Sequence, residues 1–181
     1  MENITSAQKN KMAMTYGLLI GIIYIVITSA VNLTVSNMIN FYLTKFVGYV
    51  AYFIIIGYYA TRIKKANGGY IEFREVFGAV FIMIIIAGFM SYLYNYLYMY
   101  VIDPHYMEKI KTAVVHFMEK MKAPDEKIDE TVRKFDSQME EAKHFSFKNN
   151  ILAIVGFIIM DSLFGLIVSA IVKKSRPLFN N

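Results

Sequence analysis

A single carboxylate interrupts an otherwise apolar run near the end of the sequence. Asp161 is residue 11 of 22 in the stretch 151–172, which holds no other charged residue. In a bilayer-spanning helix that position lies near the midplane, where a charged side chain costs about 2.5–3.5 kcal/mol on insertion scales. Because no Lys or Arg lies within the apolar core of any long run, no ion pair inside the membrane offsets this cost. We therefore expect Asp161 to be neutral or to share a proton with a hydrogen-bonding neighbour.

Hydroxyl groups of the other apolar runs are the candidate partners of this carboxyl group. Those at comparable depth are Tyr24, Tyr52, and Ser91 or Tyr92. Two interpretations remain open. In the first, the contact is structural and fixes the register of the helices, since interhelical hydrogen bonds contribute only about 0.6–2 kcal/mol. In the second, the group binds a proton or a cation on a permeation route, which is the default hypothesis for an intramembrane acid.

A glycine pair preceded by a basic cluster also has the residue types of a binding site. The cluster consists of Arg62, Lys64 and Lys65, and the pair of Gly68 and Gly69. A glycine-rich turn before a helix can hold phosphate, but two glutamates at 72 and 75 follow closely and would repel an anion. We favour a turn between two membrane spans, whose basic side chains form a cytoplasmic anchor that attracts anionic lipid headgroups.

The sequence gives little support to metal or covalent chemistry. The histidines are His105, His116 and His144, and two of them belong to the pairs His116–Glu119 and Glu141–His144. Di-iron proteins use such pairs together with further inward-facing acids, but a solvated, charge-rich segment produces this spacing easily. The chain has no Cys, which excludes thiolate catalysis and Cys-ligated zinc. We expect no metal, no cofactor and no enzymatic activity, because the common hydrolase, metalloprotease and nucleotide-binding motifs are missing.

The elements that position these groups are four long apolar runs. Hydrophobic residues make up 56% of the 181 residues, more than the roughly 45–50% of soluble domains. The runs cover about residues 12–35, 43–61, 76–101 and 151–172, and a spanning helix needs about 20 apolar residues. The first run continues past a weak cleavage pattern at 28–30, so we expect an uncleaved span. The sequence predicts an all-α polytopic membrane protein with four transmembrane helices in a single membrane domain.

The charges between the runs predict the orientation. Segments on the side of the N-terminus carry nine Lys or Arg against three Glu, whereas the segment 102–150 carries nine basic and ten acidic residues. Because cytoplasmic loops are enriched in Lys and Arg, we expect both termini in the cytoplasm. This topology also accounts for the net charge of +5, so no nucleic-acid partner is expected.

The segment between the third and fourth runs has a different pattern. Apolar residues recur there at spacings of three and four in two stretches, which predicts two amphipathic helices. The stripes are Met107, Ile110, Val114, Phe117 and Met121, and then Ile128, Val132, Phe135, Met139 and Ala142. We expect residues 102–149 to form an extracytoplasmic helical hairpin whose stripes face each other, the membrane or a partner.

Two small-residue patterns predict where helices approach closely. They are Gly17 with Gly21, and Gly165 with Ser169, each pair four residues apart. Small residues at this spacing let membrane helices pack at short distance. We expect the first and fourth spans to cross at these positions, and a homodimer through one of the patterns is the alternative.

The arrangement also resembles a known family. The resemblance rests on NGGYIEFREVFGAV after the second span, on YVIDPHYMEKI after the third, and on the last apolar span with its KKS tail. On these residues the chain resembles domain-of-unknown-function family 4199, uncharacterised four-span membrane proteins of bacteria. The resemblance implies a protein of the bacterial inner (plasma) membrane and supplies no catalytic residues.

These observations order the hypotheses of function. The missing catalytic groups and the amphipathic hairpin favour a non-enzymatic structural, accessory or interaction protein that acts through the hairpin. Its partner would be the membrane surface or a membrane or periplasmic protein. The alternative is a small transporter or channel subunit that uses Asp161, which four spans support only as a homo-oligomer. A membrane enzyme comes third, since no nucleophile is paired with a base.

Overall fold

Long α-helices make up nearly all of the structure. The computed structural model describes residues 4–143 and 147–176. Its helices are α1 (Ser6–Asn32), α2 (Met38–Ala66), α3 (Phe73–Leu97), α4 (Tyr106–Lys120), α5 (Asp125–Lys143) and α6 (Phe147–Val172), with a π-helical turn η1 (Tyr98–Ile102) after α3. Within these described ranges there is no strand, in agreement with the predicted all-α class.

Four helical segments are long and apolar enough to cross a membrane. They are Ser6–Asn32, Met38–Ala66, Phe73–Ile102 and Ile154–Val172, so the predicted number of spans is confirmed. α1 begins before the predicted run because Thr5 and Gln8 form a capping box, in which each side chain accepts from the backbone of the other. α2 extends five residues beyond the predicted run 43–61 at each end.

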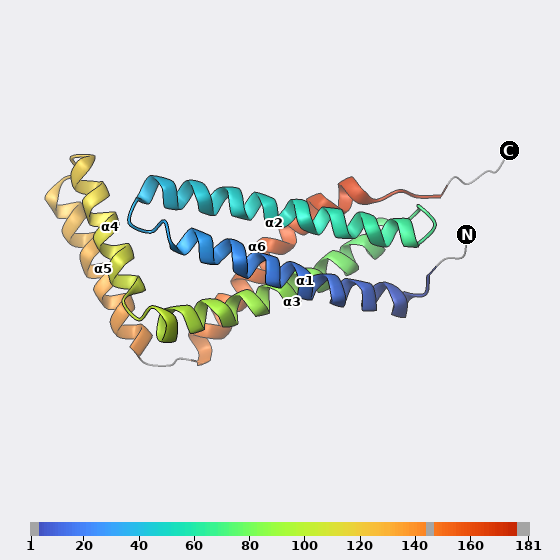
Figure 1. The fold of residues 1–181 in the computed structure, drawn as a ribbon, viewed down its shortest axis with the longest axis horizontal. Helices are drawn as coiled ribbons and strands as arrows, with labels where there is room; N and C mark the ends of the chain where they lie inside the picture. Colours follow the sequence, from blue (N-terminus) through green and yellow to red (C-terminus); the bar gives the residue numbers. More distant parts are fainter. Residues whose placement is uncertain (1–3, 144–146, 177–181) are drawn as a thin grey trace.

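α3 is the central helix of the bundle. It packs against α1 and α6, and α2 lies against the same two helices (Figure 1). In the apolar window of α3, 44% of the residues are buried, against 17–22% in the other three spans. The remaining faces expose large apolar side chains, such as Val26, Phe46 and Ile54, each about two-thirds exposed. Such an extensive apolar surface fits lipid better than water.

The two ends of the bundle are built differently (Figure 1). The start of α1, the α2–α3 turn and the end of α6 meet at one of them, which we call the basic end. Ile71 and Lys174 exchange two backbone hydrogen bonds of 2.9 Å there, and Lys9 forms an ion pair with Glu75. These contacts tie three distant chain segments together.

α4 and α5 lie side by side across the opposite end, which we call the hairpin end (Figure 1). α4 packs on the α1–α2 connection through an apolar cluster of Val31, Val35, Met38, Phe41, Tyr106 and Ala113. α5 packs on α4, and Lys111 pairs with Asp136 at 2.7 Å between them. The apolar stripe of α5 is half-buried from Ile128 to Met139, while the side chain of Ala142 lies outside the described set.

Candidate functional site

Asp161 is fully buried because of the spacing of residues along α6. The buried positions of the described part of this helix are Asp161, Gly165, Ser169 and Val172. They follow one another at intervals of four, four and three residues, so they form a single stripe that faces the other helices. The exposed fraction of Asp161 is 0%, which places its carboxyl group inside the bundle and away from lipid.

Three tyrosines from two other helices surround this carboxyl group. The Tyr49 hydroxyl donates a hydrogen bond of 2.7 Å to Asp161 Oδ1. The ring of Tyr52, which is 2% exposed, packs on the ring of Tyr24 with centroids 4.8 Å apart and on that of Tyr49 at 6.4 Å. We call these four residues the Asp161 cluster. Helices α1, α2 and α6 meet at this cluster.

Two polar atoms of the Asp161 cluster have no hydrogen-bond partner among the described residues. They are Asp161 Oδ2 and the Tyr52 hydroxyl, and the two groups are near enough to interact electrostatically. A buried polar group without a partner costs about 1–3 kcal/mol. The cluster therefore suits a proton on Oδ2, a water molecule or a small cation, each of which would satisfy a free acceptor.

The structure brings together only part of the predicted set. Tyr24 and Tyr52 join Asp161 in the cluster, whereas Ser91 and Tyr92 line a cavity between α3 and α6. Sequence reasoning misses Tyr49, which makes the direct hydrogen bond. A signal for it exists, because Tyr49 precedes Tyr52 by three residues and residues at that spacing share a helix face.

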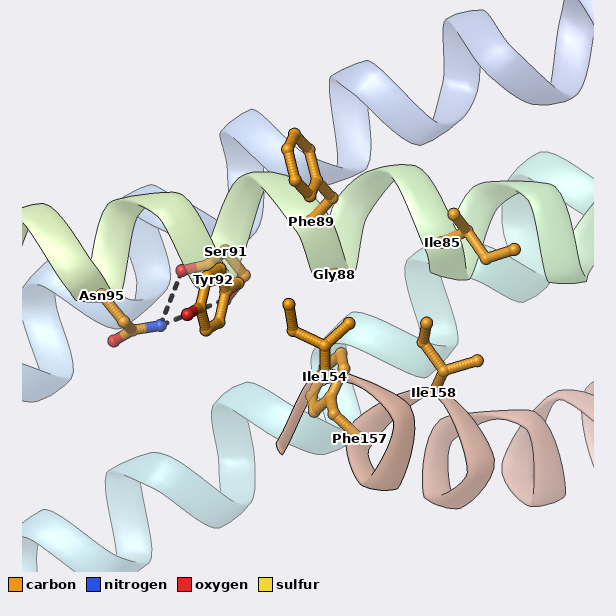
Figure 2. Close-up of a pocket in the computed structure, with 9 residues that line it drawn as sticks. All are labelled: Ile85, Gly88, Phe89, Ser91, Tyr92, Asn95, Ile154, Phe157 and Ile158. Atoms are coloured by element: carbon orange, nitrogen blue, oxygen red, sulfur yellow. Dashed lines mark hydrogen bonds between the residues drawn. The ribbon is translucent and has the colours of Figure 1, made fainter. Parts of the chain in front are cut away.

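The cavity that holds Ser91 and Tyr92 is polar at one end only. Its volume is about 280 Å³, and Figure 2 shows Ser91, Tyr92 and Asn95 together at one end. Asn95 Nδ2 donates to the Ser91 backbone carbonyl at 2.8 Å and to Ser91 Oγ at 3.3 Å. The rest of the wall consists of Ile85, Gly88, Phe89, Ile154, Phe157 and Ile158. A cavity of this kind accommodates an amphipathic molecule.

The small-residue patterns lie at helix contacts, but with a different partner than expected. A Cβ added to Gly17 or Gly165 would lie 3.0 Å from an isoleucine side-chain carbon of α3, and one added to Gly21 would lie 2.6 Å from Met90 Sδ of the same helix. Ser169 donates its hydroxyl to the Gly165 carbonyl at 2.6 Å. The predicted crossing of the first and fourth spans at these positions is therefore wrong. Each pattern instead lets its helix approach the bulky central α3.

The glycine pair reverses the chain between α2 and α3. Gly68 and Gly69 have φ angles of 75° and 86°, a left-handed conformation that glycine adopts without a steric penalty. The next helix is then capped by its own acids, since the Glu72 backbone N–H donates to the Glu75 carboxylate at 3.1 Å. These residues form a turn and a helix cap.

The basic residues beside this turn are used in different ways. Lys64 Nζ donates to the Val172 carbonyl at 2.9 Å and so helps to close the end of α6. The Arg62 guanidinium donates to the Tyr58 hydroxyl at 2.8 Å, and both Arg62 and Lys65 are exposed. Arg62 and Lys65 are thus accessible to lipid headgroups, while Lys64 has a structural contact.

The described histidines lie on the surface of the hairpin. His105 and His116 are about three-quarters exposed and lie beside Glu108 and Glu119, at 3.0 Å and 3.9 Å. His144 lies outside the described residues. In the part of the chain that the structure describes, no three His, Asp or Glu side chains are grouped to hold a metal ion. We interpret His105 and His116 as solvated surface residues.

Comparison with known proteins gives one result. A family model described as protein of unknown function (DUF4199) matches residues 15–174. This range overlaps all four membrane-length helices and includes the hairpin. No curated protein and no solved structure matches the chain significantly.

Proposed function

The chain belongs to the DUF4199 family, and from that premise we propose that it is a non-enzymatic bacterial inner-membrane protein that acts through α4 and α5. The multi-pass character rests on its four apolar helices. The partner of the hairpin is a membrane or periplasmic protein on the outer side of the membrane.

The observation that carries this proposal is the rigid attachment of α4 to the bundle. Tyr106 and Ala113 of α4 are 8% and 9% exposed, so the helix buries them against the α1–α2 connection. The Tyr106 hydroxyl also donates to Asn32 Oδ1 at 2.7 Å in a buried contact. Burial raises the pKa of Tyr106 to about 12, which keeps this donor protonated at physiological pH. α4 therefore holds α5 in a fixed position relative to the membrane spans.

The surface that α5 presents is strongly acidic. Its exposed acidic residues are Asp125, Glu126, Asp129, Glu130, Asp136, Glu140 and Glu141, and its exposed basic residues are Lys127, Arg133 and Lys134. Seven negative and three positive charges give a net charge of −4. Such a face repels anionic lipid headgroups and complements a basic protein surface. The charge thus favours a protein partner over the membrane surface.

The basic residues at the other end of the bundle support an outer location for the hairpin. Lys9, Arg62, Lys64, Lys65, Lys173 and Lys174 all belong to the segments that meet at the basic end. Lys and Arg beside membrane spans favour the cytoplasmic side. With the basic end inside, α4 and α5 lie outside.

Charge substitution on α5 tests this proposal. A photo-crosslinking amino acid at Gln138 should join the chain to one partner in intact cells. Combining Glu126→Lys with Glu130→Lys should lower that yield at least about tenfold, corresponding to about 1.4 kcal/mol. The matched variant Lys127→Glu with Lys134→Glu changes the same number of charges and should preserve the yield. Equal yields from both variants, or no specific partner, would overturn the proposal.

A second candidate function has its own supporting observation. Asp161 Oδ2 is buried and has no partner among the described residues, as a proton or cation site in a transporter subunit requires. In proteoliposomes loaded with a pH-sensitive dye, Asp161→Asn should then abolish proton or sodium flux without loss of folding. The α5 charge variants should leave that flux unchanged. Unaltered flux, or a strictly monomeric protein in native lipid particles, would leave Asp161 as a structural contact.

A further inference from the structure

We propose that the cavity between α3 and α6 (Figure 2) binds the hydrocarbon chain of an uncharged single-chain lipid, with the lipid head toward the hairpin end. The proposed partner of α5 plays no part in this inference. It concerns a different face of the protein and a different class of ligand.

The position of the cavity gives it access to lipid. Both of its walls are membrane-length helices, and its rim residues Ile85 and Phe89 are 38% and 56% exposed. On the inner side, α3 and α6 close together where a Cβ added to Gly88 would lie 2.8 Å from Phe157 Cε1. The space is thus closed toward the bundle and borders the lipid-facing surface, so a molecule from the bilayer can enter it.

The polarity of the wall runs in the same direction as in a lipid leaflet. Ser91 and Asn95 lie toward the C-terminal end of α3, which leads through η1 into the hairpin end, and the apolar residues begin at Ile85. From residue 85 to residue 95 the helix rises about 15 Å, which is half of the roughly 30 Å hydrocarbon core. The cavity therefore matches the depth of one leaflet, with polar groups near the interface and apolar groups near the midplane.

The size and charge of the wall define the ligand class. A cavity of about 150 Å³ accepts a benzene ring, so 280 Å³ accommodates a chain of about a dozen carbon atoms. None of the described residues that line it is charged, so a phosphate head would find no counter-ion in this wall. Ser91, Tyr92 and Asn95 instead offer hydroxyl and amide groups to hydroxyl or ester oxygens. A monoacylglycerol has this combination of groups.

Photolabelling of the purified full-length protein in detergent tests the proposal. The probe is a monoacylglycerol with a diazirine in its acyl chain, and the labelled residues are mapped by peptide mass spectrometry. Labels should concentrate at 85–95 on α3 and 154–158 on α6, and unlabelled monoolein should compete with them. Labels spread evenly over the lipid-facing residues of all four spans would overturn the proposal.

Two neighbouring residues of α6 provide a matched pair of variants. Ile158 lines the cavity, whereas Ile159 is 56% exposed on the outer surface. Ile158→Trp fills the cavity and should reduce competable labelling at least about tenfold, corresponding to about 1.4 kcal/mol of binding. Ile159→Trp adds the same volume outside it and should leave labelling unchanged. Equal labelling of both variants would contradict the site, and the map of the unsubstituted protein decides the matter if Ile158→Trp does not fold.

Discussion

Two tyrosine hydroxyls donate hydrogen bonds of the same length, 2.7 Å, to buried side-chain oxygens. Tyr49 donates to Asp161 inside the bundle, and Tyr106 donates to Asn32 at the hairpin end. In each case the acceptor residue has a second polar atom without a partner among the described residues, Asp161 Oδ2 and Asn32 Nδ2. The difference is chemical, because a carboxyl group can exchange a proton and a carboxamide cannot. The same geometry therefore fixes the hairpin at one place and creates an ionisable site at the other.

Removal of the two acceptors should have the largest effect and should separate the two contacts. Asp161→Leu leaves the Tyr49 hydroxyl without its acceptor and deprives the Tyr52 hydroxyl of its polar neighbour. With about 1–3 kcal/mol for each buried group left unpaired, we expect a loss of about 2–4 kcal/mol. Asn32→Leu leaves only the Tyr106 hydroxyl unpaired, so its cost should be about half. The free energy of unfolding in mixed micelles, followed by circular dichroism, measures both.

The opposite result at Asp161 is equally informative. If Asp161 is ionised and poorly compensated, its replacement by an apolar residue relieves a buried charge and stabilises the protein. A more stable Asp161→Leu variant would therefore contradict the expectation of a neutral, hydrogen-bonded carboxyl group.

Removal of the two donors should have a smaller effect and should test the charge of the acceptor. Tyr49→Phe and Tyr106→Phe each delete one hydrogen bond and keep the ring. If Asp161 is neutral, both variants should lose about 1 kcal/mol, the usual net value of a neutral hydrogen bond. A bond to an ionised carboxylate is worth about 1.5–3 kcal/mol. A clearly larger loss for Tyr49→Phe than for Tyr106→Phe, under the same unfolding conditions, would show that Asp161 is charged.

The parts of this comparison that the sequence predicts are those set by local pattern. Long apolar runs predict the spans, and the lone acid in the last run predicts Asp161 as the central polar group. The pairing of Tyr49 with Asp161 depends on the rotation of α2 about its axis, which depth counting does not include. Ser91 and Tyr92 lie at a suitable depth, but they line the cavity on another side of α6.

Partners between distant segments are harder to predict for the same reason. The spacing of Gly17 and Gly21 indicates a close approach, but it contains no information about which helix approaches. The structure assigns that place to α3. Likewise, the stripe of α4 predicts an amphipathic helix, whereas its docking beside Asn32 depends on η1, the π-helical turn that directs the chain across the hairpin end. Periodicity of three or four residues does not signal such a turn.

Alkaline pH should weaken the contact at the hairpin end. Burial raises the pKa of Tyr106 from 10.0 to about 12, so the unfolded chain loses this proton before the folded protein does. Between these two values the folded state binds more protons, and stability must fall as the pH rises. The difference in unfolding free energy between the unsubstituted protein and Tyr106→Phe should narrow over this range, because the other tyrosines cancel in the comparison. A constant difference would show that Tyr106 is accessible to water.

An exposed contact of the same length completes the comparison and should have the smallest effect. Lys134 Nζ lies 2.7 Å from Glu130 Oε1 on the outer face of α5, and both side chains are more than half exposed. The hydrogen bond from Lys134 lowers the pKa of Glu130 below its ordinary value of 4.5. Its contribution is therefore present above pH 4.5 and is lost as the pH falls through the lowered pKa.

Water and salt screen this exposed pair, and surface ion pairs contribute little to folding. Glu130→Gln should leave the unfolding of the bundle unchanged at neutral pH, in contrast to Tyr49→Phe and Tyr106→Phe, although the three contacts have the same length. A loss as large as that of Tyr106→Phe would mean that α5 is buried against another surface when stability is measured. Repeating the measurement at high salt separates these cases, because a screened pair weakens further while a buried one does not. Burial, and not distance, then ranks the three contacts.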